Sequence, residues 1–192
     1  MIYRIEKDEN MKLAAKLLLD GDIIIYSTDT LYGFGVDATN SQAIEKLNII
    51  KGRSQPYSII VSSFSMLKKY TVINDNIENE LREILPGPFT AILNKIDSDL
   101  SELVNTGLST LGVRIPDFKP ILKIVDKINK PIITTSVNYH GQDSLNNLDL
   151  INKIFSGINI FTNGKEKKSL GSTIIDFSIK PFKVLRNGDG IY

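Results

Sequence analysis

The sequence predicts an α/β protein with an open, twisted, mixed sheet and helices packed on it. Residues 23–26 are continuously apolar, as expected of a strand covered on both faces. Segments with helical spacing of apolar residues alternate with short apolar runs, which is the pattern of βα units. The last third of the chain is rich in strand-like segments, which favours a mixed sheet over a purely parallel one.

The N-terminal elements follow from local start and stop signals. We expect an edge strand over residues 2–5, then a helix over 8–19 that has Asp8 as its N-cap and ends at Gly21. A strand over 22–27 comes next. Thr39 and Gln42 form a capping-box pattern for a helix near 40–50. The two predicted buried helix faces are Met11, Ala14, Ala15 and Leu18, and Ala43, Ile44, Leu47 and Ile50.

The rest of the chain continues the alternation. A strand is expected over 57–62, and a helix over 75–85 that is capped by Asp75 with Glu78 and carries Ile77, Leu81, Ile84 and Leu85 on one face. Pro86 follows it, as a residue that cannot continue a helix. The remaining predictions are strands at 89–95, 111–115, 131–135, 158–161, 172–177 and 182–186, helices near 118–128 and 147–155, and a polar, mobile loop at 96–110.

Composition indicates an ordinary globular protein. The chain has 192 residues, of which 42% are hydrophobic and 23% charged, and such a length buries roughly 70% of its unfolded surface. It shows no internal repeat or linker-like break, so one domain over 1–192 is expected. No apolar stretch approaches the ~20 residues of a membrane span, and the N-terminus lacks the order of a signal peptide. We therefore expect a cytoplasmic protein with no membrane contact.

The residue inventory excludes several kinds of chemistry. There is no cysteine, so disulfides and thiolate nucleophiles are excluded. With His140 as the single histidine, a histidine metal cluster or a serine–histidine triad is disfavoured, and no metal site built by the protein is predicted. His140 itself lies in a probable loop and is expected to be exposed. The net charge of +1 argues against a uniformly basic nucleic-acid binder, although not against a local groove.

Polar pairs at i, i+2 spacing are the candidate ligand-binding residues. In extended backbone such residues project to one side, ~6.6–7 Å apart. Thr28 and Thr30 follow the apolar run, and Ser136 and Asn138 follow a second predicted strand. Ligands of open α/β sheets collect at the carboxyl ends of strands. The alternatives are a plain strand pair for the threonines, and an Asx-turn for Asn138.

Charged residues suggest anion binding. Lys51 and Arg53 can converge on neighbouring phosphates only if the helix has ended by Gly52; the alternative is a pair of solvated cations at a helix end. Arg114 follows a buried-looking run, so it needs an anionic partner, which is either an internal carboxylate or a ligand. Arg186 is a weaker candidate for the same need of an anionic partner.

Taken together, seven segments resemble the YrdC-type threonylcarbamoyl-AMP synthase family, in the family's order and over nearly the whole chain. They are STDTLYGFGVDA (27–38), KGRSQPYSIIV (51–61), LPGPFT (85–90), LGVRIP (111–116), TSVN (135–138), GSTIIDF (171–177) and LRNG (185–188).

The resemblance implies a short, single-domain YrdC-like fold with a concave, locally positive groove. It implies an enzyme that condenses L-threonine, bicarbonate and ATP, with Mg²⁺, to threonylcarbamoyl-AMP and pyrophosphate. Downstream threonylcarbamoyl-transferase proteins would then modify tRNAs that read codons starting with A. Contact with tRNA or double-stranded RNA is also possible on this resemblance, and the run 165–168 is a candidate for it.

The resemblance also implies roles for single residues. Lys51 and Arg53 would hold the triphosphate and stabilise the leaving pyrophosphate. The expected threonine-binding residues are Thr30, Arg114, Ser136 and Ser172, and the expected ATP-binding residues are Lys51, Arg53, Thr110, Asn138, Asn146 and Arg186.

The chain departs from the family pattern at a few positions. Ser27 and Asn187 stand where prolines are common, the 51–56 segment is about a residue short, and the extra C-terminal domain of longer members is not expected. Two other functions stay open: a double-stranded RNA or tRNA-binding module in ribosome assembly, and a carbamoyl-adenylate enzyme of hydrogenase maturation.

Overall fold

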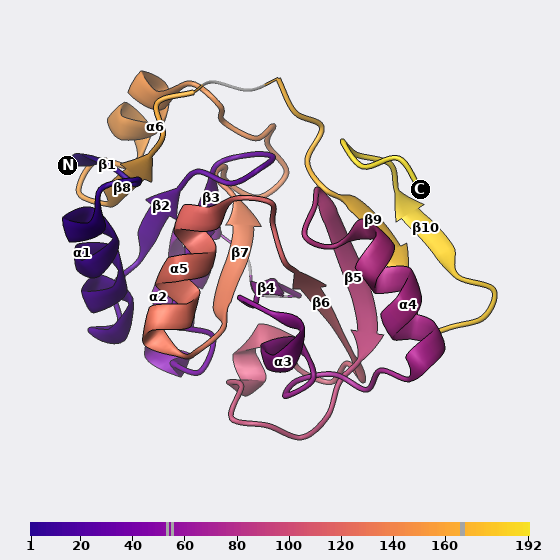
Figure 1. Ribbon diagram of the computed structural model, residues 1–192. Coiled ribbons are helices and arrows are strands. Elements are labelled where there is room, and N and C mark those ends of the chain that lie inside the picture. Colours follow the sequence, from indigo (N-terminus) through magenta and orange to yellow (C-terminus); the bar gives the residue numbers. More distant parts are fainter. Residues whose placement is uncertain (53, 55, 166–167) are drawn as a thin grey trace.

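The computed structural model describes residues 1–52, 54, 56–165 and 168–192. Among them, ten strands form one sheet in the order β1-β8-β2-β3-β7-β4-β6-β5-β9-β10 (Figure 1). The strands are β1 (Ile2–Arg4), β2 (Ile24–Tyr26), β3 (Gly33–Gly35), β4 (Ser58–Ile60), β5 (Phe89–Asn94), β6 (Thr110–Arg114), β7 (Ile132–Ser136), β8 (Asn159–Thr162), β9 (Thr173–Asp176) and β10 (Lys183–Arg186).

The sheet is mixed, as the sequence predicts. Parallel pairs join β1 with β8, β2 with β8, β4 with β6, and β5 with β9. Antiparallel pairs join β2 with β3, β3 with β7, β4 with β7, β5 with β6, and β9 with β10. Strands of opposite direction therefore alternate in the middle of the sheet, and this decides where the pocket lies.

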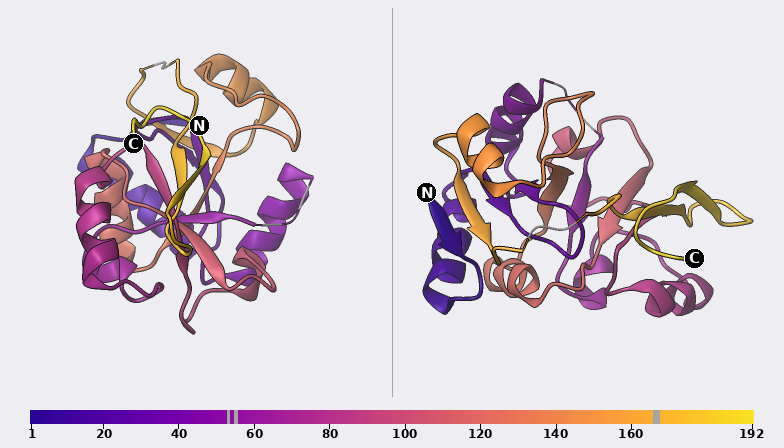
Figure 2. Two further views of the ribbon diagram at one scale, coloured as in Figure 1. Left: turned by 90° about the vertical axis from the view of Figure 1, so that its right-hand side faces the viewer. Right: turned by 90° about the horizontal axis from the view of Figure 1, so that it is seen from above.

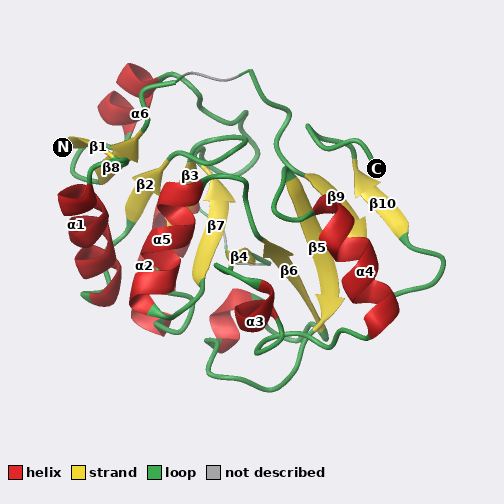
Figure 3. Ribbon diagram, viewed as in Figure 1, coloured by secondary structure: helices red, strands yellow, loops and turns green. Residues whose placement is uncertain are grey.

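Helices cover both faces of the sheet. Figure 2 shows α1 (Asp8–Leu19), α4 (Asp75–Ile84) and α5 (Lys119–Ile128) on one face, and α2 (Ser41–Lys51) on the other. The remaining helices are α3 (Phe64–Leu67), α6 (Leu148–Ile154) and the short 3-10 helix η1 (Glu102–Val104). Helices and strands alternate along most of the chain (Figure 3). No helix among the described residues is long and apolar enough to cross a membrane.

The predicted helix faces form much of the core. Met11, Ala14, Ala15 and Leu18 are all buried in α1. In α2 the buried apolar residues are Ala43, Ile44 and Leu47, whereas Ile50 is only partly buried. Leu81, Ile84 and Leu85 are buried at the end of α4, and Ile77 is partly buried. The 3.6-residue apolar period therefore identified each buried face, with at most one residue per face only partly buried.

The predicted helix caps are wrong by one residue in each case. The N-cap of α1 is Lys7, which makes no side-chain cap hydrogen bond. Asn40 caps α2 and Asn74 caps α4, each through its side-chain oxygen. Asparagine caps as well as aspartate or threonine does. Thr39 instead lies before the cap, where its hydroxyl accepts from Lys130 Nζ at 3.0 Å and donates to Asp37 Oδ1 at 2.7 Å.

Strand β3 (Gly33–Gly35) is not among the elements that the sequence predicts. Its glycines are needed because the ring of Tyr26 lies across them: a Cβ at Gly35 would come within 2.7 Å of Tyr26 Cε1. Pairing of Gly33 with Tyr26 on one side and with Ser136 on the other then joins β2 to β7. A pattern search based on β-branched residues misses such a strand.

Part of the stretch predicted as a mobile loop, 96–110, is packed. Ser101, Val104 and Asn105 are buried. The main-chain N–H of Ser101 donates to Ala38 at 3.0 Å, and that of Tyr57 donates to Val104 at 2.9 Å. These contacts fasten residues 101–105 to the α2 side of the molecule.

Candidate functional site

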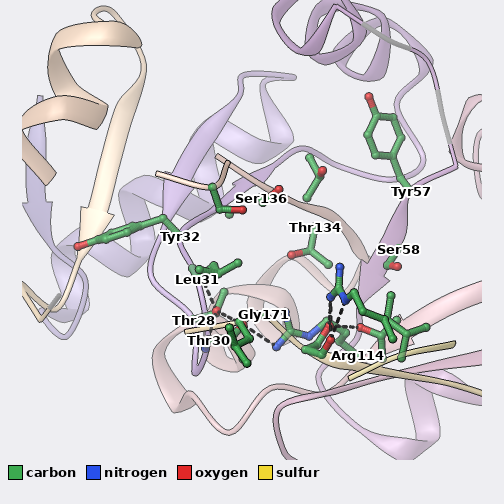
Figure 4. Close-up of a pocket in the computed structure, with 18 of the residues that line it drawn as sticks. Thr28, Thr30, Leu31, Tyr32, Tyr57, Ser58, Arg114, Thr134, Ser136 and Gly171 are labelled. Atoms are coloured by element: carbon green, nitrogen blue, oxygen red, sulfur yellow. Dashed lines mark hydrogen bonds between the residues drawn. The ribbon is translucent and has the colours of Figure 1, made fainter. Parts of the chain in front are cut away.

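A cavity of about 260 Å³ opens on one face of the sheet, lined mostly by hydroxyl groups and flanked by two arginines (Figure 4). Its walls come from the loop after β2, from β4, β6 and β7, and from the segments around β9 and β10. The lining residues that matter here are Thr28, Thr30, Ser58, Thr90, Arg114, Thr134, Ser136, Leu170, Ser172 and Arg186.

The cavity opens on the face of the sheet, and the expected carboxyl ends contribute much of its lining: Thr28 and Thr30 follow β2, and Arg114, Ser136 and Arg186 are the last residues of β6, β7 and β10. Two rows of paired residues form the floor. Thr134 pairs with Ser58, and Ser58 pairs with Gly112. In the next row, Ile60 pairs with Arg114, and Ile174 pairs with Arg186. Because β7 runs against β4, the carboxyl end of one strand meets the amino end of the other. The cavity therefore combines residues from the carboxyl ends of some strands with Ser58 from the amino end of β4.

Arg114 has an internal carboxylate partner, which was one of its two alternatives, and its ligand-binding role stays a prediction. Its Nη2 donates to Asp29 Oδ1 at 2.7 Å and to Thr30 Oγ1 at 3.2 Å. Both side chains of this ion pair are 8% exposed. Arg114 Nε is buried, lines the same cavity and has no hydrogen-bond partner among the described residues. The guanidinium is thus held by an internal carboxylate at the wall of the cavity.

The loop after β2 is shaped by its own hydroxyls. Thr28 Oγ1 donates to the carbonyl of Leu31 at 2.6 Å and accepts from the N–H of Thr30 at 3.0 Å. Asp29 Oδ2 accepts from the N–H of Asp117 at 3.0 Å. The strand-pair alternative for the two threonines is therefore wrong, because both lie in this loop.

Arg186 also lines the cavity, with Ser172. Its Nη2 donates to the Ser172 carbonyl at 2.7 Å and to Ser172 Oγ at 3.2 Å. Ser172 Oγ also shares a hydrogen bond of 2.7 Å with Thr90 Oγ1. Burial, and secondly the positive charge of Arg114, lower the pKa of Arg186. Two guanidinium groups that repel each other across a cavity favour an anionic ligand between them. The extended positive groove stays a prediction.

Lys51 ends α2, and Gly52 follows it with a φ of 64°, so the helix does end where the phosphate hypothesis requires. The solvated-cation alternative is wrong for Lys51, which is 2% exposed. Its Nζ donates to the carbonyls of Ser136 and Asn138, at 2.8 Å each, and to the side-chain oxygen of Asn138. A phosphate-binding role for Lys51 stays a prediction, because the ammonium here holds the turn after β7.

Asn138 lies behind the cavity. Its side-chain oxygen accepts from Ser136 Oγ at 2.9 Å, and its Nδ2 donates to the carbonyl of Gln142. The side chain therefore binds within the following turn, but not as the Asx-turn of the alternative, because the N–H of His140 donates to the carbonyl of Lys51. Ser136 itself lines the cavity.

The other predicted site residues lie apart from the main cavity or outside the described residues. Thr110 begins β6 opposite Asn94 and is not among the lining residues. Asn146 borders a smaller hollow that shares Thr28 and Thr30 with the main one. Arg53 lies outside the described residues. His140 is exposed, as expected.

Sequence reasoning missed several hydroxyl residues of the lining, among them Ser58, Thr134 and Thr90. Two signals could have found the first two. Thr134 stands two residues before Ser136, so it shares that residue's side of the strand. Ser58 is the polar first residue of a strand that is otherwise apolar.

The fold and this cavity define an α/β protein with a hydroxyl-lined, arginine-flanked pocket suited to a small anionic ligand. The chain belongs to the Sua5/YciO/YrdC family, whose family model, described as "Telomere recombination", matches residues 16–188.

Comparisons with known proteins agree with this membership. A relative from Methanocaldococcus jannaschii is 34% identical over 99% of this chain and 91% of its own length. A Pyrococcus abyssi relative named threonylcarbamoyl-AMP synthase is 30% identical over 93% of this chain, which spans about half, 54%, of that relative. The crystal structure of P. abyssi Sua5 complexed with L-threonine superimposes with a TM-score of 0.89 at 28% identity, covering 98% of this chain and 57% of that one.

Proposed function

We propose that this protein is an L-threonylcarbamoyl-AMP synthase. L-threonine, bicarbonate and ATP would give L-threonylcarbamoyl-AMP, pyrophosphate and water. The product would be the donor from which downstream threonylcarbamoyl-transferase proteins modify tRNAs that read codons starting with A. The names of the relatives and the threonine-bound P. abyssi structure support this assignment.

One observation of the site carries the proposal: Arg114 and Arg186 flank a single hydroxyl-lined cavity. The reaction brings together a carboxylate and a triphosphate, so it needs two separate positive groups near one pocket. Arg114 has a buried Nε–H that no described residue accepts, and it would bind the threonine carboxylate. Arg186, the second arginine of the lining, would face the nucleotide phosphates.

The remaining roles follow the family pattern. Thr30, Ser136 and Ser172 would join Arg114 around threonine, and all three line the cavity. For ATP, the proposed residues are Lys51, Arg53, Thr110, Asn138, Asn146 and Arg186. Of the described members of that set, only Arg186 lines the main cavity, so ATP would extend from it toward the smaller hollow at Asn146.

The chemistry requires positioning and charge neutralisation more than a covalent nucleophile. The neutral threonine amine attacks the bicarbonate carbon and water leaves, which gives a carbamate. One carbamate oxygen then attacks the α-phosphorus, and the bond to the bridging oxygen breaks so that pyrophosphate leaves with its electrons. The chain would orient the amino acid through Arg114 and place positive charge near the phosphates.

Mg²⁺ would enter as part of the nucleotide substrate. Among the described residues there is no group of three or more His, Cys, Asp or Glu that could hold a metal ion. Asp29, the carboxylate nearest Arg114, is engaged by that arginine and by the N–H of Asp117. The residues present therefore do not form a protein cage for Mg²⁺, and phosphate oxygens and water would supply its ligands.

The decisive experiment is pyrophosphate release from ATP, with threonine and bicarbonate omitted in turn from carbon dioxide-free buffer. Release that needs both supports the proposal, and release that needs neither rejects it. Carbamoyl phosphate in place of both would instead support the hydrogenase-maturation chemistry. A salt-dependent affinity for tRNA or double-stranded RNA, without threonine-dependent release, would favour an RNA-binding module.

A further inference from the structure

The cavity floor carries a pair of hydroxyls to which the family pattern assigns no role. Ser58 on β4 and Thr134 on β7 are directly paired across the sheet, and both line the cavity. Side chains of such a pair lie on the same face, with Cβ atoms about 4.5–5.5 Å apart. In the close-up, Thr134 lies between Ser136 and Ser58 (Figure 4). The two hydroxyls can therefore reach one small ligand together.

Neighbouring glycines make room for these hydroxyls. A Cβ at Gly112, the partner of Ser58 on β6, would come within 2.4 Å of Ser58 Oγ. At Gly33, a Cβ would lie 3.4 Å from Thr134 Oγ1 and 3.4 Å from the Tyr26 hydroxyl. Any larger residue at position 112 would displace the serine hydroxyl from its place on the floor.

Tyr26 lies beside Thr134, on the same face of the sheet, over Gly33. It is 0% exposed, and its hydroxyl has no hydrogen-bond partner among the described residues. Burial raises the pKa of this phenol, an effect that the nearby Thr134 hydroxyl partly opposes, so the phenol keeps its proton. A buried donor without a partner is costly. A rotation of the Thr134 hydroxyl toward a ligand would let Thr134 Oγ1 accept from the phenol.

The position of Ser58 and Thr134 relative to Arg114 indicates which ligand group their hydroxyls would bind. Gly112, level with the hydroxyl pair, stands two residues before Arg114 on β6, ~7 Å along the strand. In the carbamate of threonine, only the α-carbon and the nitrogen separate the amino-acid carboxylate from the carbamate carboxylate. With the first carboxylate at Arg114, the second would therefore point along the strand toward Ser58 and Thr134.

We propose that Ser58 and Thr134 form a subsite for the carbonate-derived group, which is bicarbonate before the first step and the carbamate carboxylate after it, with Tyr26 as a positioning residue beside Thr134. The subsite deepens the proposed function and rests on it. Two hydroxyl donors suit two oxygens of one trigonal, singly charged group. Neutral donors would also leave the carbamate oxygen nucleophilic, which a direct cation contact would not.

The test measures the KM for bicarbonate with saturating ATP and threonine. Ser58→Ala and Thr134→Val should each raise it about 2–10-fold, as loss of one neutral hydrogen bond implies. The Thr134→Ser variant keeps the hydroxyl, so its KM for bicarbonate should stay near the wild-type value. Ser65→Ala, at an exposed position, is the matched control. Threonine binding measured without bicarbonate should change less than twofold. A bicarbonate KM within twofold of wild type in both variants, or a rise only in threonine KM, would overturn the subsite.

Tyr26→Phe separates positioning from a structural role. Because the hydroxyl removed is unpartnered, the melting temperature should be unchanged or higher, while the bicarbonate KM rises about 2–5-fold. A bicarbonate KM equal to that of wild type would show that Tyr26 is not a positioning residue for Thr134.

A binding readout keeps the subsite separate from the proposed reaction. Isotopically labelled bicarbonate should show a broadened carbon NMR signal with the wild-type protein, and much less broadening with the Ser58→Ala, Thr134→Val double variant. Absence of broadening with wild type would reject the subsite, whatever the pyrophosphate assay gives. Broadening without threonine-dependent pyrophosphate release would reject the proposed function and keep the subsite.

Discussion

The ammonium of Lys51 lies 2.8 Å from the main-chain oxygen of Ser136, a residue 85 positions later in the chain. Lys51 also accepts from the N–H of His140 through its own carbonyl, at 3.0 Å. Lys51, at the end of α2, thus holds the turn that follows β7 through hydrogen bonds. Since Ser136 lines the cavity, this fastening fixes one wall of the site.

Replacing Lys51 with Met should therefore destabilise the protein. We expect the free energy of unfolding to fall by about 2–3 kcal/mol, because three buried oxygen acceptors lose a charged donor. Urea denaturation measures it, with the exposed Lys12→Met as control. Unchanged stability together with a large loss of ATP affinity would show instead that Lys51 acts as a phosphate ligand.

Arg114→Ala should raise the threonine KM by about 10–100-fold, as expected for loss of a charge-assisted bond of about 1.5–3 kcal/mol. Initial rates at varied threonine concentration measure the change. Arg82→Ala is the matched control, because Arg82 pairs with Glu78 on an exposed helix face. If the threonine KM of the Arg114 variant equals that of wild type, the carboxylate assignment is wrong.

Asp29→Asn tests whether the carboxylate orients the arginine. The variant keeps the shape of Asp29 but weakens the 2.7 Å ion pair to Arg114. We expect the threonine KM to rise about 3–10-fold, less than for removal of the arginine itself. In the Arg114→Ala background the same change should have little further effect, and independent, multiplying effects would contradict this coupling.

Gly112→Ala should lower stability by about 1–3 kcal/mol, because the new methyl group overlaps Ser58 Oγ. Combining it with Ser58→Gly should recover part of that loss in a double-mutant cycle. Additive losses would mean that the clash with Ser58 is not the cause.

Alkaline pH should weaken the fold through Tyr70. Burial first, and the charge of Asp99 second, raise the pKa of Tyr70 to about 12 from an ordinary value of 10.0. A raised pKa contributes stability that is fully present below pH ~10 and is lost as the pH rises toward ~12, because the unfolded chain releases the proton first. The fall in the urea midpoint between pH ~9 and pH ~11 should therefore be smaller for Tyr70→Phe than for wild type. Equal losses would assign the alkaline transition to other groups.

Local pattern alone determined the alternation of helices and strands, the mixed sheet, the buried helix faces and the end of α2 at Gly52. These features depend on residue spacing and backbone preference, which a sequence displays directly. Spacing and charge also indicated Thr30, Arg114, Ser136 and Arg186, and the family resemblance added Ser172; all five line one cavity.

Only the tertiary structure decided where that cavity lies and which partner each charge takes. The pairing of Ser58 with Thr134, of Arg114 with Asp29, and of Lys51 with the turn at Ser136 joins residues more than 75 positions apart. Strand order and register set these neighbours, and neither can be read from spacing along the chain. Pattern therefore reveals which residues can bind an anion, whereas the sheet determines which of them face the same ligand.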